Sequence, residues 1–341
     1  MDLLEILSNV RSTGSGTGNS YYMEQCAARH QLDEQFPHEG GFDAQVGVLV
    51  HKLLELHYSR KLRDVALPLD DFGDFERDPV QEALRIYASY SKYFPDDEFD
   101  VVACELQIPE VQECPDCRGG PTWNGEPCVN CDDVGEVLTA LGVLQQALLG
   151  DLVVRPYTLR PDMVVRFNEA QAAAWLERRK QTVTPGVYMV AHKPHKKAES
   201  DVVRAYSMGP QVPIYTRAYN KLCEAGLMVV GGVAQEPCQG LIINNMVRHM
   251  DMTPVATPRR AASFQAYLMD VGSELDVAVY SAHYRRQQEY LATGVPNPSQ
   301  CRSFGRVCSH YETGRCNRLT PILPPANIAG QGGSTDARER E

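Results

Sequence analysis

The fold of this chain is decided by two short apolar runs, Arg160-Pro-Asp-Met-Val-Val-Arg-Phe167 and Gly186-Val-Tyr-Met-Val-Ala-His-Lys193. Each run has the length and the apolar content of a buried strand. Residues 169–180, which lie between them, predict a short helix. Asp162 lies at the start of the first predicted strand and Lys193 at the end of the second. Neighbouring strand ends of this kind can bring a carboxylate and a lysine into one site.

Further predicted elements extend this pattern in both directions. Asp78 and Pro79 suit the start of a helix, and Gly226 suits the end of another. The order of helix, strand, two further strands, helix and strand is that of an α/β core with long decorations. We expect helices at 42–62, 78–93, 211–224 and 259–292, and strands at 99–108 and 240–247.

Length, charge and hydropathy restrict the class of protein. The 341 residues suffice for two average domains or for one large domain with insertions. No apolar run reaches the roughly 18 residues of a membrane span. The N-terminus, Met1-Asp-Leu-Leu-Glu5, has acids where a signal peptide has basic residues, so we expect a cytoplasmic protein without membrane contact. The net charge of −11 argues against sequence-independent coating of DNA, but not against a nuclease with an acidic metal site.

Before and after the two runs, the sequence contains motifs whose residues are of the kinds that a metal-dependent hydrolase uses. Phosphodiester hydrolysis requires a divalent metal held by oxygen or imidazole ligands, a polarised water, and a cation near the developing charge. Upstream lie a GxxxH motif at Gly47–His51 and an acid, Glu105, and downstream lies a QxxxY motif at Gln211–Tyr215. A histidine on an apolar helix is, taken singly, more often structural than a ligand. The order of the whole set favours a site.

This ordered set resembles the RecB-like branch of the PD-(D/E)XK nucleases, which includes phage exonucleases and the nucleases of CRISPR adaptation. The resemblance runs from about Ser20 to Cys316. It implies a restriction-endonuclease-like α/β core, with a central mixed sheet flanked by helices. It also implies a nuclease that uses Mg²⁺ or Mn²⁺, commonly an exonuclease acting on DNA ends or single strands in a phage or bacterial setting. Partners in recombination, repair or CRISPR-related processing would accompany such an activity.

The resemblance also assigns roles to individual residues. His51 and Asp162 would bind the metal, and Glu105 would be a second acidic group near it. Lys193 would orient or activate the attacking water. Along the DNA path the resemblance places Gln211 and Tyr215, and the basic residues expected beside the DNA are His195, Lys196, Lys197, Arg302 and Arg306.

One position departs from the family pattern. The residue two before Lys193 should be Asp or Glu, and here it is Ala191. Either catalysis has been lost naturally, or the acid has been replaced to trap an inactive nuclease. We favour replacement, because every other site residue is retained. On this ground alone, we expect a chain that binds DNA but scarcely cuts it.

Four cysteines in one loop predict a zinc site. Cys114-x2-Cys117 and Cys128-x2-Cys131 are two CxxC knuckles, with glycines nearby that permit tight turns. Two such knuckles suit tetrahedral zinc with four thiolate ligands. We therefore expect a zinc-binding loop at 112–136, inserted into the core, that contacts DNA or a partner.

Three further cysteines, Cys301-x6-Cys308-x7-Cys316, lie near the C-terminus. A closed metal site needs a fourth ligand. In the resembling nucleases an N-terminal cysteine joins three C-terminal ones around a [4Fe–4S] cluster, so the resemblance implies that Cys26 completes the set. Zinc is the alternative metal.

These interpretations divide the chain as follows: an N-terminal segment and linker at 1–19, a nuclease domain at 20–320 that includes the cysteine segment 297–318, and a disordered tail at 321–341. The alternative function is a non-catalytic protein that binds DNA ends or partners and keeps the nuclease fold. Restoring an acid at position 191 would discriminate between the two, because only an enzyme would then cut DNA.

Overall fold

The computed structural model of the chain describes its core elements and their surroundings. The chain divides into two compact units, one made of Met1–Thr17 and Gly40–Ser281, and the other of Gly18–Glu39 and Ala282–Glu341. The structure describes residues 3–8, 26, 28, 32, 42–59, 78–94, 98–117, 128, 131, 136–150, 159–195, 206, 209–248, 262–297, 302–303, 306–307, 312–317 and 321. Residues 9–19 of the predicted N-terminal segment and linker, and all of the predicted tail except Pro321, lie outside these residues.

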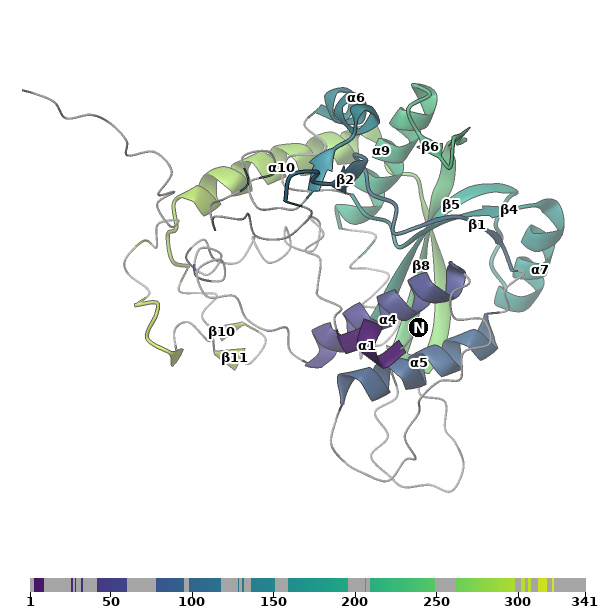
Figure 1. Cartoon of the computed structure of the whole chain (residues 1–341), viewed down its shortest axis with the longest axis horizontal. Helices are drawn as coiled ribbons and strands as arrows, with labels where there is room; N and C mark the ends of the chain where they lie inside the picture. Colours follow the sequence, from purple (N-terminus) through teal and green to yellow (C-terminus); the bar gives the residue numbers. More distant parts are fainter. Residues whose placement is uncertain are drawn as a thin grey trace, which may run out of the picture. The chain divides into compact units, whose positions relative to one another are not determined.

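A mixed sheet of five strands forms the centre of the first unit (Figure 1). β5 and β8 run parallel, whereas the other neighbouring pairs are antiparallel. In sheet order the strands are β1 (Asp100–Cys104), β4 (Met163–Phe167), β5 (Gly186–His195), β8 (Cys238–Arg248) and β9 (Ala262–Asp270). Four of these confirm the strands expected from the apolar runs, with their ends shifted by a few residues.

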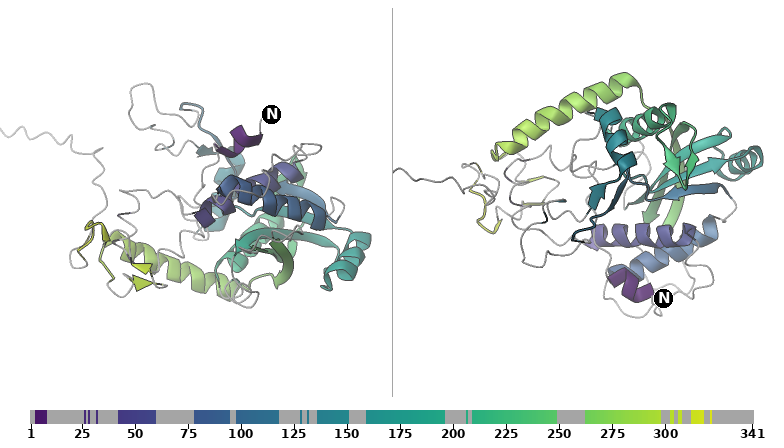
Figure 2. Two further views of the ribbon diagram at one scale, coloured as in Figure 1. Left: turned by 90° about the horizontal axis from the view of Figure 1, so that it is seen from below. Right: turned by 45° about the horizontal axis from the view of Figure 1, so that its top comes forward.

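Helices cover both faces of the sheet (Figure 2). α4 (Phe42–Tyr58) and α5 (Pro79–Tyr93) pack together against one face, and α9 (Gln211–Glu224) packs against the other. The Asp78 side chain caps α5 by accepting a hydrogen bond from the Val80 N–H at 3.0 Å. The other elements are α1 (Leu3–Ser8), α6 (Ala140–Leu149), α7 (Glu169–Arg179), α10 (Glu274–Ala292), and the paired strands β2 (Val111–Glu113) with β3 (Glu136–Leu138), β6 (Val229–Val230) with β7 (Val233–Ala234), and β10 (Arg302–Ser303) with β11 (Arg306–Val307).

Alternation along β5 sends successive side chains to opposite faces of the sheet. Tyr188 and Val190 are buried in the core beneath α4 and α5. Met189 and Ala191 are buried in the core beneath α9. Strands that are buried on both faces read as continuous apolar runs, which is why this strand was recognisable from its sequence.

The long helix expected at 259–292 is wrong in its first part. Residues 262–270 form β9, which pairs antiparallel with β8 along its whole length, and α10 begins only at Glu274. Phe264 and Ala266 pack beneath α5, whereas Tyr267 and Met269 pack towards α9. Apolar side chains lie on both faces of this strand, so its sequence lacks the strict apolar–polar alternation of a strand with one exposed face. The short helix α6 was not expected either.

The described helices show no membrane span, since none combines the length with the apolar composition that crossing a bilayer needs.

A buried arginine ties together the segments that lead into β1. Both carboxylate oxygens of Glu98 accept hydrogen bonds from Arg179 Nη2, at 2.7 and 2.9 Å, and so does the Tyr93 carbonyl at 3.1 Å. The guanidinium carbon lies 4.1 Å from the centre of the Tyr93 ring and 4.2 Å from that of Phe94. The Glu98 side chain is fully buried. Arg179 therefore neutralises a carboxylate that water cannot reach.

Arg179→Ala is expected to lower the free energy of unfolding by about 3–5 kcal/mol, because it removes the guanidinium that pairs most closely with the buried Glu98 carboxylate. Arg178 provides the matched control. Its Nη1 lies 4.0 Å from Glu98 and its side chain is 39% exposed, so Arg178→Ala should cost less than about 1 kcal/mol. Denaturant unfolding of both variants measures the difference, and equal losses would contradict the assignment.

Candidate metal centre

Three side chains that are far apart in the sequence converge at one end of the sheet. Ligand atoms of His51, Glu105 and Asp162 all lie within 4.8 Å of one another. His51 Nδ1 is 3.3 Å from Asp162 Oδ1. Carboxylate oxygens suit Mg²⁺ and Mn²⁺, and an imidazole is an accepted further ligand for a transition metal such as Mn²⁺. The donor set therefore fits the divalent ion expected from the sequence.

Strand pairing places the two carboxylates side by side. Asp162 directly precedes β4 and Glu105 directly follows β1, and the last residue of β1, Cys104, pairs with Met163. The Glu105 N–H donates to the Asp162 carbonyl oxygen at 3.0 Å. Glu105 has a φ of 50°, which lies in the left-handed region that residues other than glycine rarely adopt. The chain thus turns sharply at Glu105, and β1 ends one residue before it.

Helix α4 brings the histidine to these carboxylates. Its apolar stripe, which includes Val50 and Leu54, is buried in the core, and His51 lies beside that stripe with its side chain 27% exposed. A helical period of 3.6 residues sets this position. His51 therefore lies at the border between core and solvent, where a ligand can be both held and reached.

Asp162 is an ionised and well-oriented group. Burial would raise the pKa of Asp162, but His51, Lys193 and His192 hold it below its usual range. Burial would lower the pKa of His51, but the Asp162 carboxylate raises it overall. The His192 N–H donates to Asp162 Oδ2 at 2.5 Å. One carboxylate oxygen is thus fixed by the backbone, while the other faces the histidine.

Glu105 is the carboxylate of the site whose pKa is raised. Burial, and next the charge of Asp162, raise the pKa of Glu105 to about 7, against the opposing effects of His51 and Arg160. Arg160 Nε lies 2.9 Å from Glu105 Oε2. Two close carboxylates disfavour each other's ionisation unless a cation lies between them. A divalent ion would relieve this repulsion.

Lys193 places a positive charge beside the carboxylates. Burial would lower the pKa of Lys193, but Tyr206, Asp162 and Tyr215 raise it overall. Its Nζ lies 5.4 Å from the centre of the Tyr206 ring. Lys193 is therefore positively charged at neutral pH.

The two residues before Lys193 play different parts. Ala191 is buried beneath α9 and brings no ligand. The His192 side chain lies on the opposite face, where Asn244 Nδ2 donates to its Nδ1 at 3.1 Å. Burial lowers the pKa of His192 to about 3. The ring is therefore neutral at neutral pH, and the backbone N–H of His192 donates the hydrogen bond that orients Asp162.

Of the remaining expected site residues, the structure describes some fully, some only by their backbone, and some not at all. Gln211 opens α9, and Tyr215, one turn later, is buried near Lys193. His195 ends β5, and Arg302 and Arg306 lie in β10 and β11, but the structure describes only their backbones. Lys196 and Lys197 lie outside the described residues.

Sequence reasoning missed two residues of the site, Tyr206 and Arg160. Tyr206 lies near Lys193 but precedes the QxxxY motif without any recognisable spacing. Arg160 stands two residues before Asp162 and reaches Glu105 on the neighbouring strand end. The sequence shows Arg160 next to the Pro161–Asp162 pair. Its ion pair with Glu105 depends on which strands are neighbours, which the sequence does not show.

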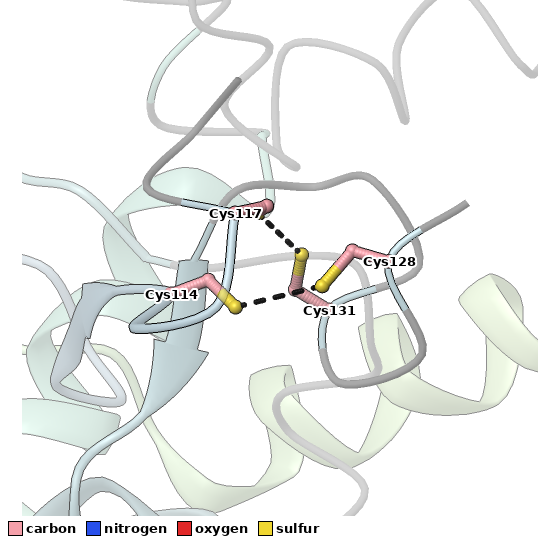
Figure 3. Close-up of side chains that lie close together, drawn as sticks. All are labelled: Cys114, Cys117, Cys128 and Cys131. Atoms are coloured by element: carbon pink, nitrogen blue, oxygen red, sulfur yellow. Dashed lines mark hydrogen bonds between the residues drawn. The ribbon is translucent and has the colours of Figure 1, made fainter. Parts of the chain in front are cut away.

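The four cysteines of the inserted loop come together as a second candidate site (Figure 3). Their sulfur atoms all lie within 4.8 Å of one another. The Sγ atoms of Cys114 and Cys128 are 3.7 Å apart, and those of Cys117 and Cys131 are 3.4 Å apart. Backbone N–H groups of Cys117 and Asp116 help to lower the pKa of Cys114 to about 7. This cluster can bind a metal such as zinc or an iron–sulfur cluster.

Two of the four cysteines expected around an iron–sulfur cluster also come together. Cys26 and Cys316 lie in one buried group with Ala28 and Leu32, in the second unit. The Asn297 N–H donates to Cys26 Sγ at 3.3 Å. The other two expected ligands, Cys301 and Cys308, lie outside the described residues.

Comparisons with protein families, curated proteins and solved structures found no match for this chain.

Cys128→Ser is expected to remove the metal bound by the cysteine loop, since a closed tetrahedral site needs all four sulfur ligands. The core should stay folded, because the loop joins it through the separate β2–β3 pair. Cys223→Ser, which changes a cysteine outside the cluster, is the control and should keep the metal. Elemental analysis and thermal unfolding measure the two effects. Global unfolding of the Cys128 variant would contradict the independence of the loop.

Proposed function

We propose that this protein is a metal-dependent deoxyribonuclease of the RecB-like PD-(D/E)XK type. The observation that carries the proposal is the convergence of His51, Glu105 and Asp162, with the half-buried Lys193 close by. Carboxylates, an imidazole and an ammonium group in one place are the groups that metal-assisted phosphodiester hydrolysis requires.

The order of the core elements supports the same proposal. Along the chain, α4, β1, β4, β5, α9 and β8 follow one another in this order, and the elements between them are α5, the β2–β3 pair with the cysteine loop, α6, α7 and the β6–β7 pair. The parallel pairing of β5 with β8 needs a crossover connection, and the segment between them contains α9. This helix, three-strand, helix, strand order agrees with the restriction-endonuclease-like core that the resemblance implies.

Each side chain has a defined task in this proposal. His51, Asp162 and Glu105 would hold a divalent ion, which supplies Lewis acidity and a more acidic water when bound. Lys193 would donate a hydrogen bond to the attacking water or to a phosphate oxygen and offset the charge that develops there. Tyr206 and Tyr215 would keep the ammonium group in position. The backbone N–H of His192 would keep Asp162 oriented throughout.

The substrate follows from the resemblance and from the charge distribution. Exonucleolytic cleavage of DNA ends or single strands is the family's common activity. The basic run of His195, Lys196 and Lys197 follows Lys193 closely in the sequence. Its positive charge suits contact with a phosphate backbone. A bacterial or phage-infected cytoplasm, and partners in recombination, repair or CRISPR-related processing, complete the proposal.

The nuclease proposal predicts metal-dependent cleavage that depends on Lys193. DNA degradation is measured with Mn²⁺ or Mg²⁺ in the chain as given and in Ala191→Glu. In whichever background is active, Lys193→Ala should reduce the rate by at least about 100-fold, because removing one preorganised donor typically costs that much. Lys221→Ala, an exposed lysine on α9, is the control and should cut at a rate close to that of its parent.

If both backgrounds bind DNA and Mn²⁺ but neither cuts, the nuclease proposal fails. The non-catalytic DNA-end or partner-binding protein would then take its place. Equal rates on circular and linear single strands would keep the nuclease but reject an exonuclease.

We also propose that the cysteine loop binds zinc. A tetrahedral site with Zn–S distances of roughly 2.3 Å sets its sulfur atoms roughly 3.8 Å apart, close to the 3.7 and 3.4 Å found here. The base of the loop is rigid: Gln145 accepts from the Glu110 N–H at 2.7 Å and donates to the Leu227 carbonyl at 2.9 Å. A methyl group on Gly142 would lie 1.9 Å from the Glu110 carbonyl oxygen. As expected from the sequence, the loop would contact DNA or a partner.

A [4Fe–4S] cluster held by Cys26, Cys301, Cys308 and Cys316 is the third part of the proposal. Support comes from the shared burial of Cys26 and Cys316 and from the N–H donated to Cys26 by Asn297. Backbone donors to the ligand sulfurs are a recognised feature of such clusters. The cluster would join the two ends of the chain.

Anaerobically purified protein should then be brown, with broad absorption near ~400 nm that is typical of a [4Fe–4S] centre. Cys26→Ser should bleach this absorption and lower the thermal stability, whereas Cys223→Ser should leave both unchanged. A colourless protein with two zinc ions per chain would rule out the cluster in favour of the alternative metal.

A further inference from the structure

Asn245 is a buried polar residue of β8 that the proposed function does not use. It is fully buried, and so are the apolar residues of the same strand on either side of it, among them Ile243 and Met246. Within the part of the chain that the structure describes, neither Nδ2 nor Oδ1 of Asn245 has a hydrogen-bond partner. A buried amide without partners lowers stability, and an apolar side chain of similar size would avoid this cost. Such a group in a core strand therefore requires an explanation.

Strand pairing places this amide beside the lysine of the candidate metal centre. β5 and β8 run parallel, and Lys193 pairs with Asn245. Residues that pair in this way direct their side chains to the same face of the sheet. The residues two positions earlier on each strand, Ala191 and Ile243, are buried beneath α9, so Lys193 and Asn245 also face α9. Neighbouring strands lie about 4.8 Å apart, and the amide therefore lies alongside the lysine side chain.

The ammonium group of Lys193 has more donors than its known contacts use. It carries three N–H donors. Tyr206 is hydrogen-bonded to Lys193 and takes one of them. In the proposed reaction a second donor is directed to the attacking water or to a phosphate oxygen. One donor is left, and the amide of Asn245 provides a buried acceptor on the neighbouring strand.

We propose that Asn245 is a positioning residue of the nuclease: its carbonyl oxygen accepts a hydrogen bond from the Lys193 ammonium, directly or through one buried water. This inference rests on the proposed function. A lysine side chain is long and flexible, so a second acceptor besides Tyr206 fixes the direction in which the ammonium points. Such orientation matters, because a displacement of about 1 Å at a reacting group lowers a rate by about 100-fold.

Two variants of the same shape test the inference. Asn245→Val removes every acceptor, whereas Asn245→Thr keeps one oxygen at this position. They are made in the background that cuts DNA, either the chain as given or Ala191→Glu. Asn245→Val should lower kcat at least about tenfold with little change in KM, because a loosely held lysine stabilises the transition state less well. Asn245→Thr should keep more of the kcat, and both should unfold at the parent's denaturant midpoint.

Two comparisons separate positioning from packing. Ile243→Val, a change on the same face of the same strand, is the control and should leave kcat unaltered. In a Lys193→Ala background, Asn245→Val should lower the rate no further, because Asn245 acts through that lysine. A tenfold further loss there would contradict the inference, and so would a loss of kcat that Asn245→Thr and Ile243→Val share.

The outcomes distinguish this inference from the proposed function. Unchanged kcat in Asn245→Val would overturn the inference and keep the nuclease. If neither background cuts, the nuclease proposal fails, and a high-resolution crystal structure of the parent chain still decides the contact. The Lys193 Nζ should then lie within about 2.7–3.2 Å of the Asn245 amide oxygen, or of one water that this oxygen binds. A longer separation without a bridging water would overturn the inference without any variant having to fold.

Discussion

The antiparallel pairing of β4 with β1 and β5 is the constraint on which the rest of the site depends. It fixes the end of β1 and the start of β4 beside each other, through the hydrogen bond from Glu105 to Asp162. It also places the His192 N–H on the Asp162 carboxylate. A shift of one residue in the β1–β4 register would separate the two carboxylates, and a shift of one residue in the β4–β5 register would send Lys193 to the opposite face. The apolar faces buried beneath α4, α5 and α9 prevent such a shift.

Charge balance follows from this geometry. Two buried carboxylates would repel each other strongly in a medium of low polarity. Within the described residues, His51, Lys193 and Arg160 offset them in part. Burial, and next the charge of Asp162, still raise the pKa of Glu105 to about 7. A divalent ion bound between the carboxylates would offset their repulsion, as the proposed chemistry requires.

The sequence predicted the parts of this structure that depend on local pattern. The strands carrying Asp162 and Lys193 and the CxxC knuckles were recognisable because apolar runs and ligand spacing are short-range signals. Long-range pairing decided the rest: β9 was mistaken for helix because apolar side chains lie on both of its faces. The roles of Tyr206 and Arg160, and the place of Glu105 next to Asp162, depend on which strands are neighbours, and that information is spread over the whole chain.

The position of a bound metal ion tests the central claim most directly. Crystals grown with Mn²⁺ and measured near the manganese absorption edge would locate the ion by its anomalous scattering. The account predicts a peak bounded by His51, Glu105 and Asp162, with an oxygen of Glu105 within roughly 2.0–2.4 Å of the ion. A manganese peak elsewhere, or none between these three residues at saturating Mn²⁺, would contradict it.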